Sequence, residues 1–273
     1  MTDAEFTPLR RFIKFSTDAY GLERILRLFQ ACLGLAAAYI LPNWSSLLLL
    51  SSIFRPLNIP GSLVILARLQ SQIGIIRRTI RVFRFLDAFL AAYTLSTSTS
   101  TLSLTVSLDI FSNMSNGMYL LLETITIIDA LNIPGLCIWE AGYSNVLRME
   151  AQRSWLLALV SGGLAAAIRL AHARAERQAI LTKKALLDKE DKDESGEKEK
   201  QTKIAEQQAL KLQQLNMQTQ ALGRKIIANM IDILLPGSVI GWTPVSPGTV
   251  SLATFITTFI TGYDVWVKLN GPK

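Results

Sequence analysis

The 273-residue chain has little of what most catalytic sites need. It contains one histidine, His172, and two cysteines, Cys32 and Cys137, which stand far apart with no CxxC spacing. It also lacks the phosphate loops GxGxxG and GxxxxGK(S/T) and the G-x-S-x-G nucleophile motif. A single histidine excludes metal clusters built on several histidines. We therefore expect no enzyme, no cofactor and no metal site, and we expect two reduced, inert thiols that are buried in apolar surroundings.

Charge is scarce and unevenly distributed. Only 18% of the residues are charged and 50% are hydrophobic, with a mean hydropathy of +0.31, which is too apolar for an ordinary soluble domain of this size. The net charge is +7, yet residues 85–147 contain no lysine or arginine. Basic residues concentrate in 10–84 and 148–225, as is typical of segments kept on the cytosolic side of a membrane. The chain is therefore predicted to be a membrane protein.

The stretch RLQSQIGIIRRTIRVFRFLDAFL, residues 68–90, indicates an amphipathic helix that extends over about 62–93. At about 100° per residue, its bulky apolar residues share one arc and most of its arginines share the opposite arc. The apolar arc includes Leu69, Ile73, Ile76, Ile80 and Phe83, and the basic arc contains Arg77, Arg78, Arg81 and Arg84.

Two interpretations of this helix compete. A helix of a soluble protein packs its apolar stripe on a core, but its solvated face normally mixes charges of both signs. Here the polar arc is almost purely cationic, which favours a helix lying in a membrane interface. We predict that the five apolar side chains insert into lipid and that the four arginines bind the headgroups of an anionic phospholipid membrane. A nucleic-acid partner is not expected, because aromatic residues for base stacking are missing from the basic arc.

Four apolar stretches could enter a bilayer, although none matches a clean run of about 20 apolar residues. They are residues 28–54, 109–140, 154–168 and 233–263. The strongest spanning candidate is a helix in the last stretch, with Ser246 as its N-cap and Pro247 at its first position. The predicted fold class is all-α: a membrane-associated helical bundle with a long interfacial amphipathic helix and one or more marginal membrane-spanning helices.

The predicted organisation has five parts. An N-terminal helical region that contains the amphipathic helix is followed by a Ser/Thr-rich linker, then by apolar helices and a long helix. A charged linker and a final helix with a C-terminal membrane segment complete the chain. Their ranges are 1–95, 96–108, 109–187, 188–200 and 201–273.

Three blocks of sequence together resemble the peroxin-11 family of peroxisomal membrane proliferation proteins. They are KFSTDAYGLERILRLFQ (14–30), the arginine-rich stretch 68–90, and IANMIDILLPGSVIGWTPVSPGTVSLATFITTFITGYDVW (227–266). Their order and spacing match the family's opening helix, its amphipathic segment and its C-terminal helix. The glycine of the opening turn is displaced to Gly21, and the charged linker is not part of the family pattern. The resemblance is therefore to a divergent, fungal-type member.

The resemblance implies residence in the peroxisomal membrane, self-association into a homo-oligomer, and elongation of the organelle before fission by a dynamin-related GTPase. Our hypothesis for the mechanism is that the amphipathic helix enlarges one leaflet and so bends the bilayer. Two alternatives remain open. One is a peroxisomal pore or metabolite channel lined by Glu123, Asp129 and Asp232. The other is a scaffold that recruits fission factors through residues 188–223.

Overall fold

In a computed structural model, the described residues are 7–40, 59–99, 103–190 and 198–271, and within these ranges helices are the regular structure present. The predicted all-α fold is confirmed. The helices are α1 (Thr7–Thr17), α2 (Ala19–Leu35), the π-helical segment η1 (Ala36–Ile40), α4 (Ile59–Ile80), α5 (Arg84–Ser98), α6 (Leu104–Ile125), α7 (Ile127–Ala130), α8 (Ala141–Glu190), α9 (Lys198–Asp232), α10 (Leu234–Ile240) and α11 (Pro247–Asn270).

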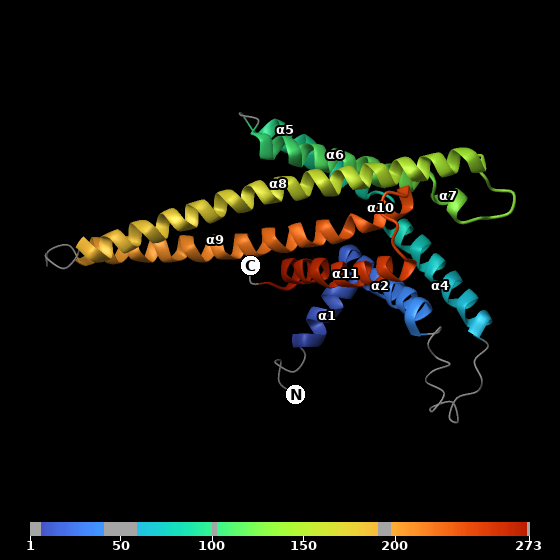
Figure 1. Ribbon diagram of the computed structural model, residues 1–273, viewed down its shortest axis with the longest axis horizontal. Helices are drawn as coiled ribbons and strands as arrows, with labels where there is room; N and C mark the ends of the chain where they lie inside the picture. Colours follow the sequence, from blue (N-terminus) through green and yellow to red (C-terminus); the bar gives the residue numbers. More distant parts are fainter. Residues whose placement is uncertain (1–6, 41–58, 100–102, 191–197, 272–273) are drawn as a thin grey trace, which may run out of the picture.

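The two longest helices, α8 and α9, form an antiparallel hairpin that extends well beyond the rest of the molecule (Figure 1). The α5–α6 hairpin packs along α8 on one side of it. On the other side lie α2 and α11, which pack on each other, with α4 beside α2. Helix α1 contacts α11, and the rings of Phe15 and Trp266 are 5.5 Å apart. The first and last described helices therefore lie together.

Side-chain caps fix where three of these helices begin. Asp18 accepts hydrogen bonds from the backbone N–H groups of Tyr20 and Gly21 at 2.9 and 3.1 Å, and α2 starts at the next residue. Ser103 caps α6 in the same way. Ser246 accepts from the N–H of Thr249 at 3.2 Å. These oxygens satisfy N–H groups that have no partner in a first helical turn. The predicted start of the C-terminal helix at Ser246 is confirmed.

The amphipathic stretch is interrupted where one helix over about 62–93 was predicted. Helix α4 ends at Ile80 and α5 begins at Arg84. Between them the backbone tightens into i→i−3 hydrogen bonds, such as the 3.0 Å bond from the Arg84 N–H to the Arg81 carbonyl. The hydroxyl of Thr124, from α6, donates to the carbonyl of Val82 at 2.9 Å. A side chain that takes a helical carbonyl is a known cause of a kink.

Both predicted linkers are shorter than expected. Helix α5 continues to Ser98 and α6 begins at Leu104, so much of the Ser/Thr-rich segment is helical and residues 100–102 lie outside the described residues. Within α5 the hydroxyl of Thr97 donates to the carbonyl of Tyr93, one turn earlier, at 3.0 Å, so this polar side chain has a partner inside the helix. The long helix is confirmed as α8. Of the charged linker, residues 191–197 lie outside the described residues.

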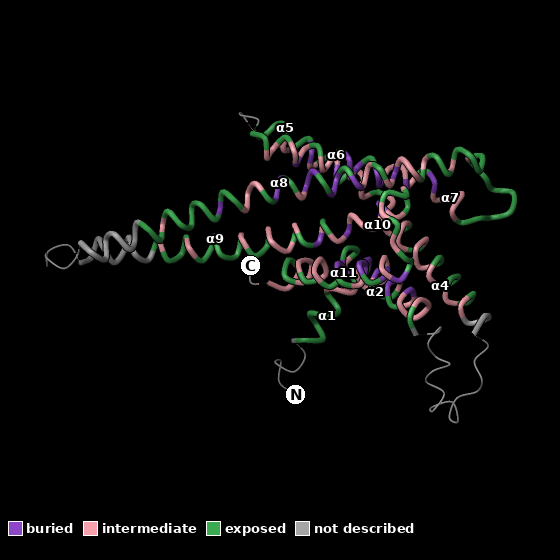
Figure 2. Tube along the Cα trace, in the orientation of Figure 1, coloured by how far each residue is buried: buried purple, intermediate pink, exposed green. Residues whose placement is uncertain are grey.

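Much of the described chain is exposed or half-buried (Figure 2). The kinds of residue that are buried and exposed reverse the pattern of a soluble bundle. The two cysteines, which were expected to be buried, are exposed. Large apolar side chains are exposed, among them Phe83 at 74% and Trp242 at 71%. Charged residues are buried instead, and the buried apolar residues are mostly alanine. Small residues and threonine at helix contacts, with ionisable groups turned inward, are typical of helices that pack in lipid. The molecule is a membrane-associated helical bundle.

Two of the described helices are long and apolar enough to cross a bilayer. One is α11, Pro247–Asn270, which sequence analysis ranks first. The other is the portion of α8 from Ala141 to Thr182, which is 42 residues long. Residues 154–168 alone are too few to span a bilayer. They lie within this longer helix, which is long enough.

Candidate functional site

Arg77, near the end of α4, and Arg81, in the turn that follows it, face other helices of the bundle. Arg77 donates to Oε1 of Glu23 on α2 through Nη2 at 2.6 Å and through Nε at 3.1 Å. Arg81 donates through Nη2 to Oε2 of Glu123 on α6 at 2.8 Å, and its Nη1 lies 3.9 Å from Glu23. Glu23 and Glu123 are 2% and 8% exposed. These are charge-assisted contacts in the interior, where they join α2, α4 and α6.

The other two arginines of the predicted basic face also have partners. Nε of Arg78 lies 3.6 Å from Oε1 of Glu123, and Arg78 has no closer ion pair among the described residues. The guanidinium carbon of Arg84 lies 3.7 Å from the centre of the Tyr20 ring, a cation–π contact. All four arginines therefore contact protein, and binding to phospholipid headgroups stays a prediction. A headgroup could reach them only by entering the bundle or by separating these contacts.

The apolar residues of the same stretch divide into two groups. Leu69, Ile76 and Phe83 are 46%, 48% and 74% exposed, whereas Ile73 and Ile80 are half-buried. The arc that was predicted to insert into lipid thus points outward at three positions and packs against protein at two. Insertion itself stays a prediction.

A second set of buried charges was not predicted from the sequence. Arg27 of α2 donates through Nη2 to Oδ1 of Asp232 at 2.6 Å and to Oγ1 of Thr257 at 3.1 Å. The Thr257 hydroxyl donates to the same Asp232 oxygen at 2.7 Å. Thr257 is 0% exposed, and the three residues come from α2, α9 and α11. The available signal was the pair Glu23 and Arg27, one helical turn apart in a mostly apolar helix that also carries Arg24.

Burial and neighbouring charges shift the pKa values of Glu23, Arg24 and Tyr119. Burial alone raises the pKa of Glu23, but the positive charges of Arg24, Arg77 and Arg81 outweigh it and lower the pKa to about 2. Burial lowers the pKa of Arg24 to about 10, against the raising effect of Glu23. Burial raises the pKa of Tyr119 to about 12, so its phenol is neutral near pH 7. Glu23 is therefore ionised and Arg24 is charged near pH 7.

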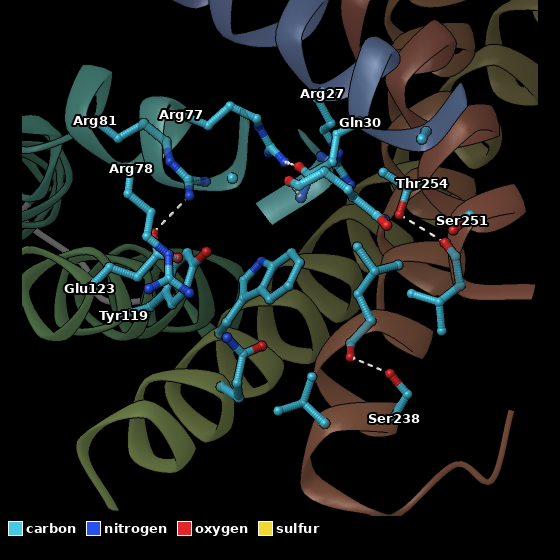
Figure 3. A pocket seen from close by; sticks show the side chains of 18 residues that line it. Arg27, Gln30, Arg77, Arg78, Arg81, Tyr119, Glu123, Ser238, Ser251 and Thr254 are labelled. Carbon is cyan, nitrogen blue, oxygen red and sulfur yellow. Dashed lines mark hydrogen bonds and ion pairs between the residues drawn. The ribbon is translucent and has the colours of Figure 1, made fainter. Parts of the chain in front are cut away.

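These side chains surround two cavities. The first, of about 290 Å³, lies between Arg27 and Gln30 of α2 and the arginines of α4, with residues of α10 and α11 closing another side (Figure 3). The second, of about 420 Å³, shares Arg27, Arg81, Tyr119 and Trp155 with the first. The Tyr119 and Trp155 rings stack with their centres 5.2 Å apart. We call the six arginines that line these cavities the arginine cluster: Arg24, Arg27, Arg77, Arg78, Arg81 and Arg84.

The carboxylates that sequence analysis assigned to a channel have structural partners. Glu123 and Asp232 are paired with arginines, as described above. Asp129 accepts hydrogen bonds from the backbone N–H groups of Ile138 and Trp139 at 2.8 and 3.3 Å, which holds the loop between α7 and α8. Within the described ranges, no group of three or more His, Cys, Asp or Glu residues could hold a metal ion. The geometry favours binding of an anion over acid–base or metal chemistry.

Comparison with curated proteins and with solved structures finds no similar protein. A family model does match, over residues 9–266, and its description is peroxisomal biogenesis factor 11 (PEX11). The matched range contains the whole arginine cluster, its carboxylate partners and both candidate spanning helices up to residue 266.

Proposed function

Because the chain belongs to the peroxisomal biogenesis factor 11 family, whose members act in peroxisome biogenesis and are not a known class of enzyme, we propose a specific role in that process. The protein resides in the peroxisomal membrane and elongates it by inserting an apolar edge of α4 and α5 into one leaflet. Elongation prepares the organelle for fission. Self-association and a dynamin-related GTPase as partner are parts of the same proposal.

The observation that carries the proposal is a row of exposed apolar side chains at seven-residue intervals, which we call the apolar edge. It consists of Leu69, Ile76, Phe83 and Leu90, which are 46%, 48%, 74% and 60% exposed. A spacing of seven residues drifts by only about 20° around an α-helix, so Leu69 and Ile76 stay near one side of α4. Phe83 lies in the turn between α4 and α5, and Leu90 lies on α5, so the row continues across the break at residues 81–83. An exposed apolar row of this length is typical of a surface that contacts lipid or another protein.

The apolar edge supplies the energy for insertion. Full burial of one leucine, isoleucine or phenylalanine side chain contributes about 1.5–3 kcal/mol. Four side chains that are already about half exposed can therefore hold α4 and α5 at the level of the acyl chains without any headgroup contact. Material added to one leaflet enlarges it relative to the other, and the bilayer bends toward that side. Many copies on one membrane would favour a tubule over a sphere.

The experiment uses the full-length protein in vesicles that contain anionic phospholipid. The double variant Phe83→Asp/Leu90→Asp places two charges on the apolar edge. We expect it to abolish tubulation, measured as tubule length by electron microscopy, because charged side chains resist insertion. Leu210→Asp is the matched control, since Leu210 is 61% exposed on the α8–α9 hairpin. If the double variant tubulates vesicles as the parent protein does, the apolar edge is not the membrane wedge.

A further inference from the structure

The arginine cluster carries more positive charge than its carboxylates neutralise. Six guanidinium groups and four carboxylates line the two cavities, which leaves two positive charges without a counter-ion. The carboxylates are Glu23, Asp87, Glu123 and Asp232. Surplus charge of one sign in a buried site is costly unless a ligand of opposite charge compensates it.

Some guanidinium donors in the cluster also lack partners. The Nε atoms of Arg27 and Arg81 are buried, and neither has a hydrogen-bond partner among the residues that the structure describes. Arg78 reaches Glu123 only at 3.6 Å, beyond hydrogen-bond distance. A buried donor without an acceptor is uncommon in folded proteins and indicates a missing partner. Because several of these donors lack an acceptor, the missing partner has to accept several hydrogen bonds.

The first cavity is also lined by neutral polar groups. Ser251 and Thr254 of α11 lie across it from Arg77, Arg78 and Arg81 (Figure 3). Gln30 and Gln70 line it as well, from α2 and α4. Guanidinium groups match the oxygens of a phosphate geometrically and can bind two of them at once. The hydroxyls of Ser251 and Thr254 donate to the carbonyls of Pro247 and Val250 at 3.0 and 2.8 Å, and rotation of each hydroxyl turns its hydrogen toward a ligand oxygen. A volume of about 290 Å³ is at the lower end for a small-ligand site.

We propose that this cavity binds a phosphomonoester or inorganic phosphate group, held between Arg27 of α2 and the group Arg77, Arg78 and Arg81. A phosphomonoester carries about −1.5 to −2 charges at pH 7, which is comparable to the surplus of two counted over the two adjoining cavities. The group is supplied either by a phospholipid headgroup or by a free phosphate compound. The site is distinct from the apolar edge, so the proposal does not depend on membrane bending.

The first experiment measures thermal unfolding of the full-length protein in neutral detergent micelles. Inorganic phosphate, dihexanoyl phosphatidic acid and dihexanoyl phosphatidylcholine are added in separate titrations, with potassium chloride keeping the ionic strength constant. A ligand that binds only the folded state raises the unfolding temperature saturably. We expect a rise with phosphatidic acid, with inorganic phosphate, or with both, and none with phosphatidylcholine.

The titrations with phosphatidic acid and with inorganic phosphate together identify the source of the phosphate group. A rise with phosphatidic acid alone assigns the site to a lipid headgroup, and a rise with inorganic phosphate alone assigns it to a free compound. If neither changes the unfolding temperature more than potassium chloride does, or if phosphatidylcholine is equally effective, the proposal is overturned.

Two variants test whether the arginine cluster is responsible. Arg78→Gln removes the arginine with the loosest ion pair and should weaken phosphate binding at least tenfold. Arg153→Gln is the matched control, because Arg153 pairs with Glu150 on the surface of α8, and it should leave binding unchanged. Glu123→Gln removes a competing carboxylate and should tighten binding several-fold. A purely structural cluster would give no opposite effects, so equal loss in Arg78→Gln and Glu123→Gln would also overturn the proposal.

Discussion

A single guanidinium, that of Arg27, joins three helices. It meets Asp232 from α9 and Thr257 from α11, and all three residues are buried. A buried ion pair is weak evidence for added stability, because removing its charges from water offsets most of their attraction. Removing one partner is different, because the other charge then stays buried without compensation.

Asp232→Asn should therefore destabilise the protein by about 3–5 kcal/mol. The measurement is thermal unfolding in detergent micelles. Asp264→Asn is the matched control, since Asp264 pairs with Arg224 at 3.0 Å but both side chains are more than a third exposed, and exposed pairs contribute about 0–1 kcal/mol. Similar losses in the two variants would contradict the assigned role of Arg27.

Gly21 is a second residue whose position leaves no room for a side chain. A Cβ atom at this position would lie 1.9 Å from the backbone carbonyl oxygen of Phe15, so Gly21→Ala should push α1 away from α2. We expect a loss of about 1–3 kcal/mol, measured as above. Gly223→Ala, where a Cβ meets nothing within 4 Å, should instead stabilise α9 by up to about 1 kcal/mol. A stabilising Gly21→Ala would show that α1 packs elsewhere.

At the scale of elements, the junction of α2 with α4 should depend on pH through Glu23. The pKa of Glu23 is lowered from 4.5 to about 2 in the folded protein. A lowered pKa stabilises the fold above the unfolded-state value, and this contribution is lost as the pH falls from about 4.5 toward 2. The unfolding temperature should fall over that window, and the fall should be smaller in Glu23→Gln. Glu150→Gln, at an exposed pair, should keep the parent profile.

The residue at which a helix begins could be predicted from the sequence better than the neighbours that its side chains face. The cap at Ser246 is local, so it could be recognised from neighbouring residues. The break between α4 and α5 could not, because the Thr124 hydroxyl that takes the Val82 carbonyl comes from α6. A helical projection correctly separated arginine from isoleucine around the helix axis. It could not show that the arginines face acids on α2 and α6, since those contacts join residues 42 to 54 positions apart.

At the scale of the whole molecule, the α8–α9 hairpin extends away from the bundle (Figure 1). Its only described side-chain ion pair between the two helices is Lys211 with Glu176, at 2.6 Å, with both side chains about half exposed. Basic residues concentrate in this region, which predicts that the hairpin lies on the cytosolic side. The fission-factor scaffold that sequence analysis left open would use this part of the chain.

Trypsin added to sealed peroxisomes should therefore cleave the hairpin near Arg177 and Lys211, with fragments identified by mass spectrometry. Both residues are exposed. A matrix enzyme in the same preparation must stay intact, as the control for sealed membranes. Cleavage that requires detergent would place the hairpin in the organelle lumen and reverse the predicted orientation.

The family and the all-α class could both be predicted from the sequence, because they depend on composition and on the order of motifs. The buried clusters could not, because they join positions far apart in the chain. Buried polar groups and exposed apolar ones also reverse the rule by which soluble cores are normally recognised.

The contact between Arg27 and Asp232 spans 205 residues of sequence, and its contact with Thr257 spans 230. Translation proceeds at about 5–20 residues per second, so about 10–40 s separate the synthesis of this arginine from that of its acid. During that interval the guanidinium of Arg27 on α2 has no carboxylate partner, because Asp232 has not yet been synthesised. The N-terminal helices therefore cannot reach their final packing until α9 and α11 have been synthesised.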